Sequence, residues 1–194
     1  MQQTNRIISY MNRVGVDYTT LEHQRSDSLL HTAMICNIDP AAIAQAVFLD
    51  NSRGPIMAVI PLSHVIRLDW IESFTRLKTR NHELDESATL FSDCEPGTIP
   101  PVAIPYGLQA IIDKSLLQQP EIYFRPGRYD QLIKLDTKSF FALHRYSIQG
   151  NIAESMPDYS YQPTTRDESR KSTVVSPLYQ ENGKKLEASV KQLK

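Results

Sequence analysis

Cysteine and glycine are scarce in this sequence, and long apolar runs are missing. Its two cysteines are too few for a disulfide framework and lack metal-binding spacing, so we expect a reducing compartment. The seven glycines are scattered singly, which excludes the glycine-rich phosphate loops, and we expect no nucleotide or other cofactor. The five histidines show no paired spacing, so no metal site is expected.

No apolar stretch reaches the roughly 18 residues that a membrane-spanning helix needs, and the N-terminus lacks the apolar core of a signal peptide. We therefore expect a cytoplasmic protein without membrane contact. The formal net charge is −1 and the pI is about 6.5, so no overall positive field attracts nucleic acid. Any contact with a nucleic acid has to be local.

The chain has 194 residues, of which 41% are hydrophobic, and this suits one domain with an appendage. Hydrophobic periodicity predicts a series of short strands with helices around them. The expected helices are 5–13 with Thr4 as N-cap, 29–36 with Asp27 or Ser28, one around Trp70 to Leu77 with Ser63 or Asp69, and a short one after Asp136. The expected strands are 16–20, 43–49, 56–60, 102–106, 109–113, 121–124 and 131–135. The turn 51–54 should join 43–49 and 56–60 in a hairpin, and 125–130 should join 121–124 and 131–135 in a second one. Without a βαβ repeat, the pattern favours an α+β fold with a curved, partly closed mixed β-sheet and peripheral helices.

The stretch 91–107 contains four prolines and two glycines, and it is the segment around which we expect the chain to be organised. Such a density excludes regular structure, because proline lacks an amide donor and glycine allows unusual backbone angles. A helical turn at 86–91 should precede it. Two interpretations stay open: a structural crossover, or a loop that presents fixed backbone N–H groups to a carbonyl or phosphate oxygen.

Four motifs in order give the chain a family resemblance. They are Asp93-Cys94-Glu95-Pro96-Gly97-Thr98-Ile99-Pro100-Pro101, then Tyr106-Gly107, Ile112-Asp113-x-x-Leu116 and Tyr123-Phe124-x-x-Gly127. From about Ile7 to Leu143 the sequence resembles the YbaK/prolyl-tRNA-synthetase-associated domain. The resemblance implies a mixed β-barrel fold and hydrolysis, in trans, of the ester of a mischarged aminoacyl-tRNA. It also implies contact with the tRNA acceptor end.

The resemblance further implies which residues form the site. Gln45, Gly97 and Pro101 would be catalytic, and the substrate would be bound by Asp93, Thr98, Ile99, Pro100, Gly127, Arg128 and Tyr129. Gln45 stands where the family usually has a lysine, and Tyr129 where related members often have a histidine. A glutamine donates only neutral hydrogen bonds, which are about half as strong as charged ones. Activity would therefore be weakened or lost, leaving a protein that binds aminoacyl-tRNA or a protein partner.

Several alternatives stand beside this hypothesis. The fold could serve an unrelated small-molecule binder, and Gln45 could be a structural residue on the open face of a strand. Asp93 and Glu95 could activate water or only make loop hydrogen bonds, whereas Cys94, between two acids, is interpreted as a packing residue. The basic cluster Arg76, Lys78 and Arg80 either complements a helix dipole or contacts a tRNA backbone.

The composition changes after His144. Residues 155–176 are rich in Ser, Thr, Pro and charge, which predicts a flexible linker. We therefore place a domain at 1–148 and a flexible tail at 149–194. Within the tail, Leu186, Val190 and Leu193 fall at helical spacing, so 184–194 is either a frayed end or a short helix that docks to a protein partner or RNA.

Overall fold

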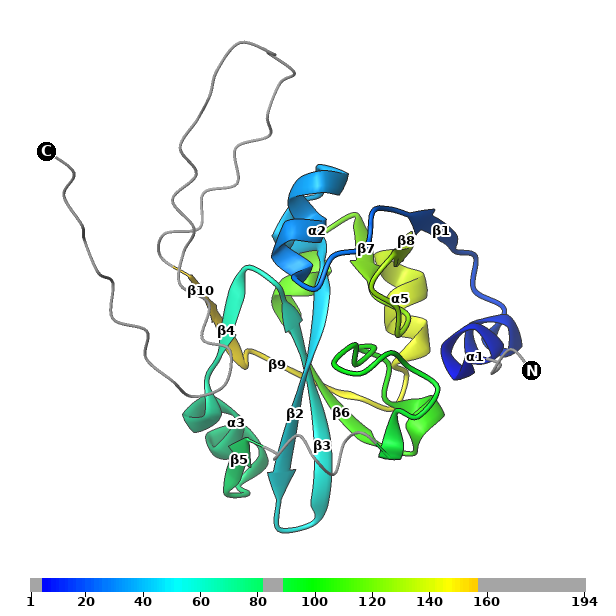
Figure 1. Cartoon of the computed structure of the whole chain (residues 1–194). Helices are drawn as coiled ribbons and strands as arrows, with labels where there is room; N and C mark the ends of the chain where they lie inside the picture. Colours follow the sequence, from blue (N-terminus) through cyan, green and yellow to red (C-terminus); the bar gives the residue numbers. More distant parts are fainter. Residues whose placement is uncertain (1–4, 82–88, 157–194) are drawn as a thin grey trace, which may run out of the picture. The chain divides into compact units, whose positions relative to one another are not determined.

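The computed structural model describes residues 5–81 and 89–156, which form a mixed α+β fold of helices and several sheets (Figure 1). The helices are α1 (Arg6–Val14), α2 (Leu29–Cys36), α3 (Leu68–Thr75) and α5 (Thr137–Leu143), with 3-10 turns η1 (Pro40–Ala42), η2 (Ile104–Tyr106) and η3 (Lys114–Gln118). The strands are β1 (Thr19–Glu22), β2 (Ala44–Asn51), β3 (Gly54–Pro61), β4 (His64–Ile66), β5 (Thr79–Asn81), β6 (Gln109–Asp113), β7 (Glu121–Phe124), β8 (Gln131–Asp136), β9 (Ile148–Gly150) and β10 (Ala153–Ser155).

A five-stranded mixed sheet in the order β5-β2-β3-β6-β9 is the centre of the fold. Its antiparallel β2–β3 hairpin is paired from Ala44↔Pro61 to Asn51↔Gly54, which confirms the hairpin predicted from the sequence. The side chain of Asn51 accepts a hydrogen bond from the Arg53 amide at 2.7 Å and so closes the turn. Strand β6 runs parallel to β3 and to β9.

The other strands form two smaller antiparallel sheets, β1-β8-β7 and β10-β4. A single parallel bridge between Ile43 and Tyr123 joins the start of β2 to β7. Within the described residues the strands thus form three sheets and no closed one. The mixed α+β class is confirmed, but the partly closed barrel is not.

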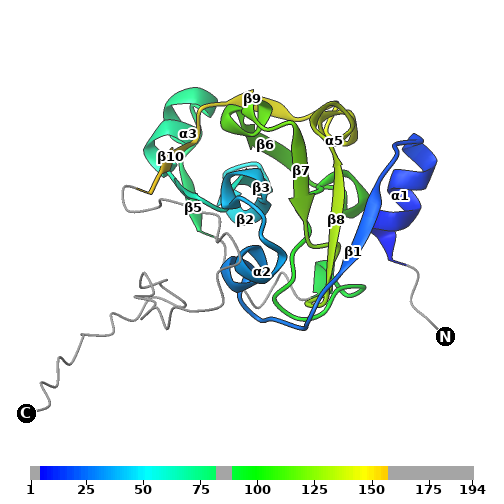
Figure 2. The same cartoon turned by 90° about the horizontal axis from the view of Figure 1, so that it is seen from above.

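Alternation along the β2–β3 hairpin divides the apolar core, because successive side chains of a strand point to opposite faces. On one face Ala44 and Phe48 pack with α1 and α5, in a cluster that includes Met11 and Phe140. On the other face Leu49 packs with Ile71 of α3 and with Ile152 (a second cluster). Figures 1 and 2 both show α3 on one side of the hairpin and α1 and α5 on the other.

Helix α2 begins and ends as the sequence predicts. The Ser28 side chain accepts a hydrogen bond from the His31 amide at 3.2 Å, and Asn37 ends the helix in the left-handed conformation. The first helix begins one residue later than expected, because the Asn5 side chain accepts from the Ile7 and Ile8 amides. The strand predicted at 16–20 lies instead at 19–22, as β1.

Two local predictions are wrong. Neither Ser63 nor Asp69 caps α3; Arg67 occupies the N-cap position without a side-chain cap. The apolar run 102–106 is not a strand but contains η2, since Ala103 has helical backbone angles and Pro105 has no amide to give to a ladder. Of the helical turn predicted at 86–91, residues 86–88 lie outside the described residues, and Thr89 and Leu90 are helical as expected.

The fold continues past the expected domain end at residue 148. Strand β9 begins there, Ile152 is fully buried and β10 pairs with β4. The buried carboxylate of Asp113 accepts hydrogen bonds from the amides of Ile152 at 2.7 Å and Ala153 at 2.9 Å. Residues 149–155 are therefore part of the folded domain and not a flexible tail. The linker and tail helix predicted beyond them lie outside the described residues.

Candidate active site

The segment 93–101, here called the Gly97 loop, is fastened to the tip of the β7–β8 hairpin, residues 125–130. The Glu95 amide donates to the Gly127 carbonyl at 2.9 Å, and the Tyr129 amide donates to Glu95 Oε2 at 2.6 Å. The Tyr129 hydroxyl donates to the Pro96 carbonyl, also at 2.6 Å. These bonds join two segments that are far apart in the sequence and fix the backbone on either side of Gly97.

Two glycines make this close approach feasible. Gly97 has φ +85° and Gly127 has φ +103°, values that residues with a side chain rarely adopt. A Cβ atom on Gly97 would lie 2.8 Å from the Tyr129 hydroxyl, and one on Gly127 would lie 2.6 Å from Cys94 Sγ. Both positions therefore require glycine for space as well as for backbone conformation.

The hydrogen bonds of the Gly97 loop leave two of its backbone donors free. Thr98 is buried, and its amide and hydroxyl both donate to the Glu95 carbonyl, at 2.9 and 2.6 Å. Among the described residues, the amide N–H groups of Gly97 and Ile99 have no hydrogen-bond partner. Gly97 is exposed, so its N–H group can reach a ligand. Two free amides on a fixed loop are the arrangement that an oxyanion hole uses.

The end of the loop is held from the other side by His144, which is buried at the end of α5. Its Nε2 lies 2.7 Å from the Pro101 carbonyl oxygen and its Nδ1 lies 2.8 Å from the Phe140 carbonyl oxygen. Burial lowers the pKa of His144, an effect that the two carbonyl contacts partly oppose. The carbonyl of Pro101 is thus tied to the end of α5.

The side chains of Asp93 and Cys94 make contacts within the protein that hold the loop in place. Asp93 Oδ2 accepts from the Arg6 amide at 2.9 Å, at the first turn of α1, and from the Tyr106 hydroxyl at 3.3 Å. Cys94 Sγ lies 3.3 Å from the same hydroxyl, and burial raises the pKa of this thiol to about 11. A thiol that stays protonated at neutral pH supports the interpretation of Cys94 as a packing residue rather than a nucleophile.

Glu95 is the most connected acid of the loop. Arg25 Nη1 donates to Glu95 Oε1 at 2.7 Å, and the Arg25 guanidinium stacks on the Tyr129 ring at 4.7 Å. The hydrogen bond from Arg25, followed by that from the Tyr129 amide, lowers the pKa of Glu95. Glu95 is therefore a carboxylate at neutral pH, and both of its oxygens are used to hold the loop. Arg128, by contrast, pairs with Asp130 at 2.7 Å and makes no hydrogen bond to the loop.

Gln45 lies half-buried near the start of β2, where its Nε2 donates to the Pro61 carbonyl at 3.4 Å. Its partner in the register is Ile60, which belongs to the second core cluster. Its neighbours Ala44 and Ala46 face the first cluster, which also receives Cys94 and Ile99. No hydrogen bond joins Gln45 to the Gly97 loop within the described residues. The structure thus brings the loop and the hairpin tip together. The Gln45 side chain, in contrast, lies on the face of β2 opposite to the one that packs with Cys94 and Ile99 of the loop.

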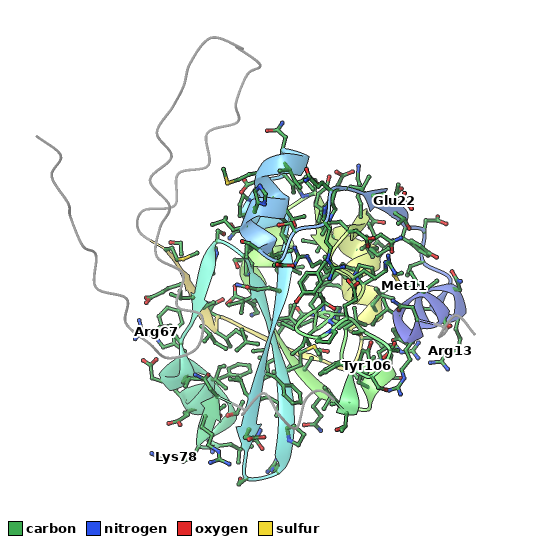
Figure 3. All side chains as sticks on the ribbon, in the orientation of Figure 1. Met11, Arg13, Glu22, Arg67, Lys78 and Tyr106 are labelled. Carbon is green, nitrogen blue, oxygen red and sulfur yellow. The ribbon has the colours of Figure 1, made fainter. Side chains whose placement is uncertain are left out.

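The basic cluster near α3 lies away from this site. Because α3 ends at Thr75, Lys78 and Arg80 follow the helix and do not complement its dipole, so that interpretation is wrong for them. Arg80 pairs with Asp50 at 3.7 Å and lines a shallow hollow by the β2–β3 turn. Figure 3 shows Lys78 well separated from Tyr106. Any tRNA contact of this cluster would be remote from the Gly97 loop.

Residues 5–81 and 89–156 contain no group of three or more potential metal ligands. None of the helices described is long and apolar enough to cross a membrane.

Comparison with solved structures gives the same fold at low sequence identity. A hypothetical protein named APE2540 has a TM-score of 0.69 at 16% identity, over 77% of this chain and 99% of that one. A candidate trans-editing enzyme for prolyl-tRNA synthetase has a TM-score of 0.65 at 18% identity, over 77% of this chain and 96% of that one. A candidate signal transduction protein from Marinobacter aquaeolei VT8 has a TM-score of 0.63 at 14% identity, and the match spans 78% of this chain but 31% of that protein.

A comparison with curated proteins finds no match. The profile of the aminoacyl-tRNA editing domain, in contrast, matches residues 23–143, more than half of the chain. This region contains the Gly97 loop, the hairpin tip and the whole central hairpin. The chain belongs to the aminoacyl-tRNA editing domain family.

Proposed function

We propose that this protein is a YbaK-like deacylase that acts in trans, in the cytoplasm, and hydrolyses the ester bond of a mischarged aminoacyl-tRNA. The observation that carries the proposal is the pair of free amides at Gly97 and Ile99, on a loop held by hydrogen bonds at Glu95, Pro96 and Thr98. Attack of water on the ester turns its carbonyl oxygen into an oxyanion. Donors that are already oriented stabilise this charge without reorganising.

The roles follow from the positions of the groups. The amides of Gly97 and Ile99 would donate to the oxyanion, and the Tyr129 side chain would border the space over the loop. Gln45 makes no hydrogen bond to the loop among the described residues, so it would contribute a neutral donor only by giving up its long bond to Pro61 and turning toward the ligand. A weakly basic site of this kind positions water rather than activating it strongly, so we expect slow turnover.

The test is deacylation of a panel of mischarged tRNAs, including Ala-tRNA(Pro) and Cys-tRNA(Pro), by the wild type and by Gly97→Ala. The variant should lose about a hundredfold in kcat, the usual effect of disturbing an oxyanion donor. Gly107→Ala is the matched control, since Gly107 also has a positive φ of +69° but has open space around it. Equal activity of the two variants would argue against a role for the loop, and an inactive wild type would argue against the deacylase.

A second function, binding of aminoacyl-tRNA without turnover, is favoured by one observation. The Tyr129 hydroxyl is bonded to the Pro96 carbonyl and would lie 2.8 Å from a Cβ at position 97, and we infer that it narrows the approach to the free amides. Tyr129→Phe keeps the ring and removes that hydroxyl. If the wild type binds but does not hydrolyse the tRNA panel and Tyr129→Phe does hydrolyse it, the protein is a binder whose tyrosine closes the site.

A further inference from the structure

Two exposed arginines, Arg13 on α1 and Arg145 just after α5, form no ion pair with a carboxylate within the described residues. Arg25 and Arg128, by contrast, each pair with a carboxylate at 2.7 Å. Arg125 is only 7% exposed, and its Nη2 donates to backbone carbonyls just before α2. The positive charges of Arg13 and Arg145 are therefore available to a partner outside the chain.

Contacts through Tyr10 bring these two arginines to one surface. The Tyr10 hydroxyl donates to the Leu143 carbonyl at 3.0 Å and so joins α1 to the end of α5, two residues before Arg145. The Arg13 guanidinium lies 5.4 Å from the centre of the Tyr10 ring. Burial raises the pKa of Tyr10, and the positive charges of Arg145 and Arg13 oppose this shift. Both guanidinium groups thus lie near the same buried tyrosine.

Tyr146 adds an aromatic ring to this surface. It is 77% exposed, more than any other large hydrophobic side chain of the described residues. The Arg145 guanidinium lies 4.9 Å from the centre of its ring. Guanidinium groups bind phosphates, and aromatic rings and guanidinium planes are what unpaired RNA bases stack on. Arg13, Arg145 and Tyr146 are here called the α1–α5 surface.

Both elements that carry the α1–α5 surface are fastened to the Gly97 loop. At the start of the loop, the Arg6 amide in α1 donates to Asp93 Oδ2 at 2.9 Å. At its end, His144 Nε2 lies 2.7 Å from the Pro101 carbonyl oxygen. Arg13 follows Arg6 by seven residues, so it lies on the same face of α1, about 10 Å further along the helix. The surface therefore begins close to both ends of the loop.

The three residues of the α1–α5 surface lie outside residues 23–143, the part of the chain that the family profile matches. The profile therefore gives them no role. Since the formal net charge of the chain is −1, attraction of a polyanion depends on cations that are gathered locally and are not paired with acids. Arg13 and Arg145 meet that condition next to the candidate site.

We propose that the α1–α5 surface binds the unpaired 3′ end of the RNA whose ester reaches the Gly97 loop. Arg13 and Arg145 contact backbone phosphates, and a base stacks on Tyr146. The inference deepens the proposed function and rests on it for the identity of the RNA. The exposed ring beside the two charges favours RNA over an acidic peptide, which has no base to stack.

Binding is measured with the full chain and a fluorescent RNA hairpin that carries no amino acid and ends in a few unpaired 3′ nucleotides. Arg13→Gln/Arg145→Gln should raise Kd about tenfold or more at low salt and reduce the slope of log Kd against log salt by about 1.4, since each phosphate contact on a single strand contributes about 0.7. Arg53→Gln/Lys78→Gln is the charge-matched control, because it also removes two exposed cations, and Figure 3 shows Lys78 well separated from Arg13. The control should change Kd by less than about twofold. Equal effects of the two double variants would overturn the inference.

The stacking contact has its own test. Tyr146→Ala should weaken binding of this hairpin about fivefold or more, whereas Tyr146→Phe, which keeps the ring, should stay within about twofold of the wild type. A blunt-ended hairpin without the unpaired nucleotides should bind all three proteins equally. If Tyr146→Ala has no effect, or the same effect on both hairpins, no unpaired base stacks on Tyr146 and the proposal is refuted.

Two further measurements separate this inference from the proposed function and from another polyanion. In deacylation of the mischarged tRNA panel, Arg13→Gln/Arg145→Gln should raise KM and leave kcat close to the wild-type value. If the wild type binds the hairpin as expected but hydrolyses no tRNA, the deacylase proposal fails and the RNA surface stands; if it does not bind the hairpin, the surface fails whatever the turnover. Loss of binding to phosphatidylserine vesicles in the arginine variant, with RNA binding unchanged, would assign the surface to a membrane and overturn the inference.

Discussion

Gly97 and Tyr129 fit together so closely that a single added carbon would displace one of them. The Cβ of an alanine at position 97 would lie 2.8 Å from the Tyr129 hydroxyl, which itself is bonded to the Pro96 carbonyl at 2.6 Å. The contact joins the loop that holds the free amides to the hairpin tip. Its geometry leads to the first prediction.

Gly97→Ala should destabilise the domain by about 1 to 3 kcal/mol, because alanine is strained at a positive φ and the tyrosine must move. In a Tyr129→Phe background the same substitution should cost less, since the hydroxyl that obstructs the new carbon is gone. Urea unfolding of the four proteins measures this coupling. Additive effects of the two substitutions would show that the contact is not close in solution.

Gly127→Ala should be more destabilising than Gly97→Ala. Its Cβ would meet Cys94 Sγ at 2.6 Å and Cys94 Cβ at 3.0 Å, and Cys94 is packed in the core and cannot swing away. Truncation by Cys94→Ala should relieve only part of the effect, because the contact with Cβ stays. Thermal unfolding of the single and double variants checks this order.

Glu95→Gln should remove roughly 1 kcal/mol of stability at neutral pH, since a charged acceptor becomes neutral. The pKa of Glu95 is lowered in the folded state, so its contribution is present above the unfolded value of about 4.5 and is lost as pH falls through the folded pKa. The variant and the wild type should therefore converge in stability at acid pH. Glu22→Gln, on exposed β1, serves as control, and a gap that persists at low pH would contradict the assignment.

His144 should make the domain sensitive to mild acid. Its pKa is lowered by burial, so the unfolded chain binds a proton more readily, and stability falls as the pH drops below about 6.5. His144→Gln should flatten this part of the pH profile, at the expense of overall stability. Exposed His31→Gln should leave the slope unchanged. A wild-type profile that is flat between pH 5 and 7 would exclude a neutral buried imidazole.

A chain that ends at Met156 should fold, whereas one that ends at residue 148 should not. The shorter chain leaves the Asp113 carboxylate without two amide donors, at about 1 to 3 kcal/mol each, and loses the buried Ile152, at about 2 kcal/mol. Circular dichroism and urea unfolding distinguish the two fragments. If the shorter fragment folds with full stability, the domain ends at residue 148, as predicted from the sequence.

The parts of the fold that could be predicted are those determined by local chemistry. Ser28 and Asn37 fix both ends of α2, and the Asn51 turn fixes the β2–β3 hairpin. The apolar run 102–106 misled the prediction, because it is buried like a strand although Pro105 prevents strand pairing. Strand β10 was not predicted, because it is short and carries no apolar pattern. Its position depends on Asp113, which lies 39 and 40 residues before the Ile152 and Ala153 amides that donate to it.

For the candidate site, too, the residues of the local motif could be predicted, whereas those joined by long-range contacts could not. The motif predicted that Gly97, Gly127 and Tyr129 belong together, and the structure joins them. Arg25, Arg125 and His144 were missed, because their bonds reach residues 43 to 99 positions away and no spacing in the sequence marks them. A buried arginine whose partners are backbone carbonyls looks like any other arginine until the chain is folded.

The hydrogen bonds from the Ile152 and Ala153 amides to Asp113 also determine when, during synthesis, the fold can be completed. On the ribosome, all five strands of the central sheet, β9 included, leave the tunnel before Ile152 does. Until then the Asp113 carboxylate has only Ser115 as a partner and faces a gap in the second core cluster. We expect the nascent chain to stay open, and reachable by chaperones or proteases, until its last strand arrives to complete the core.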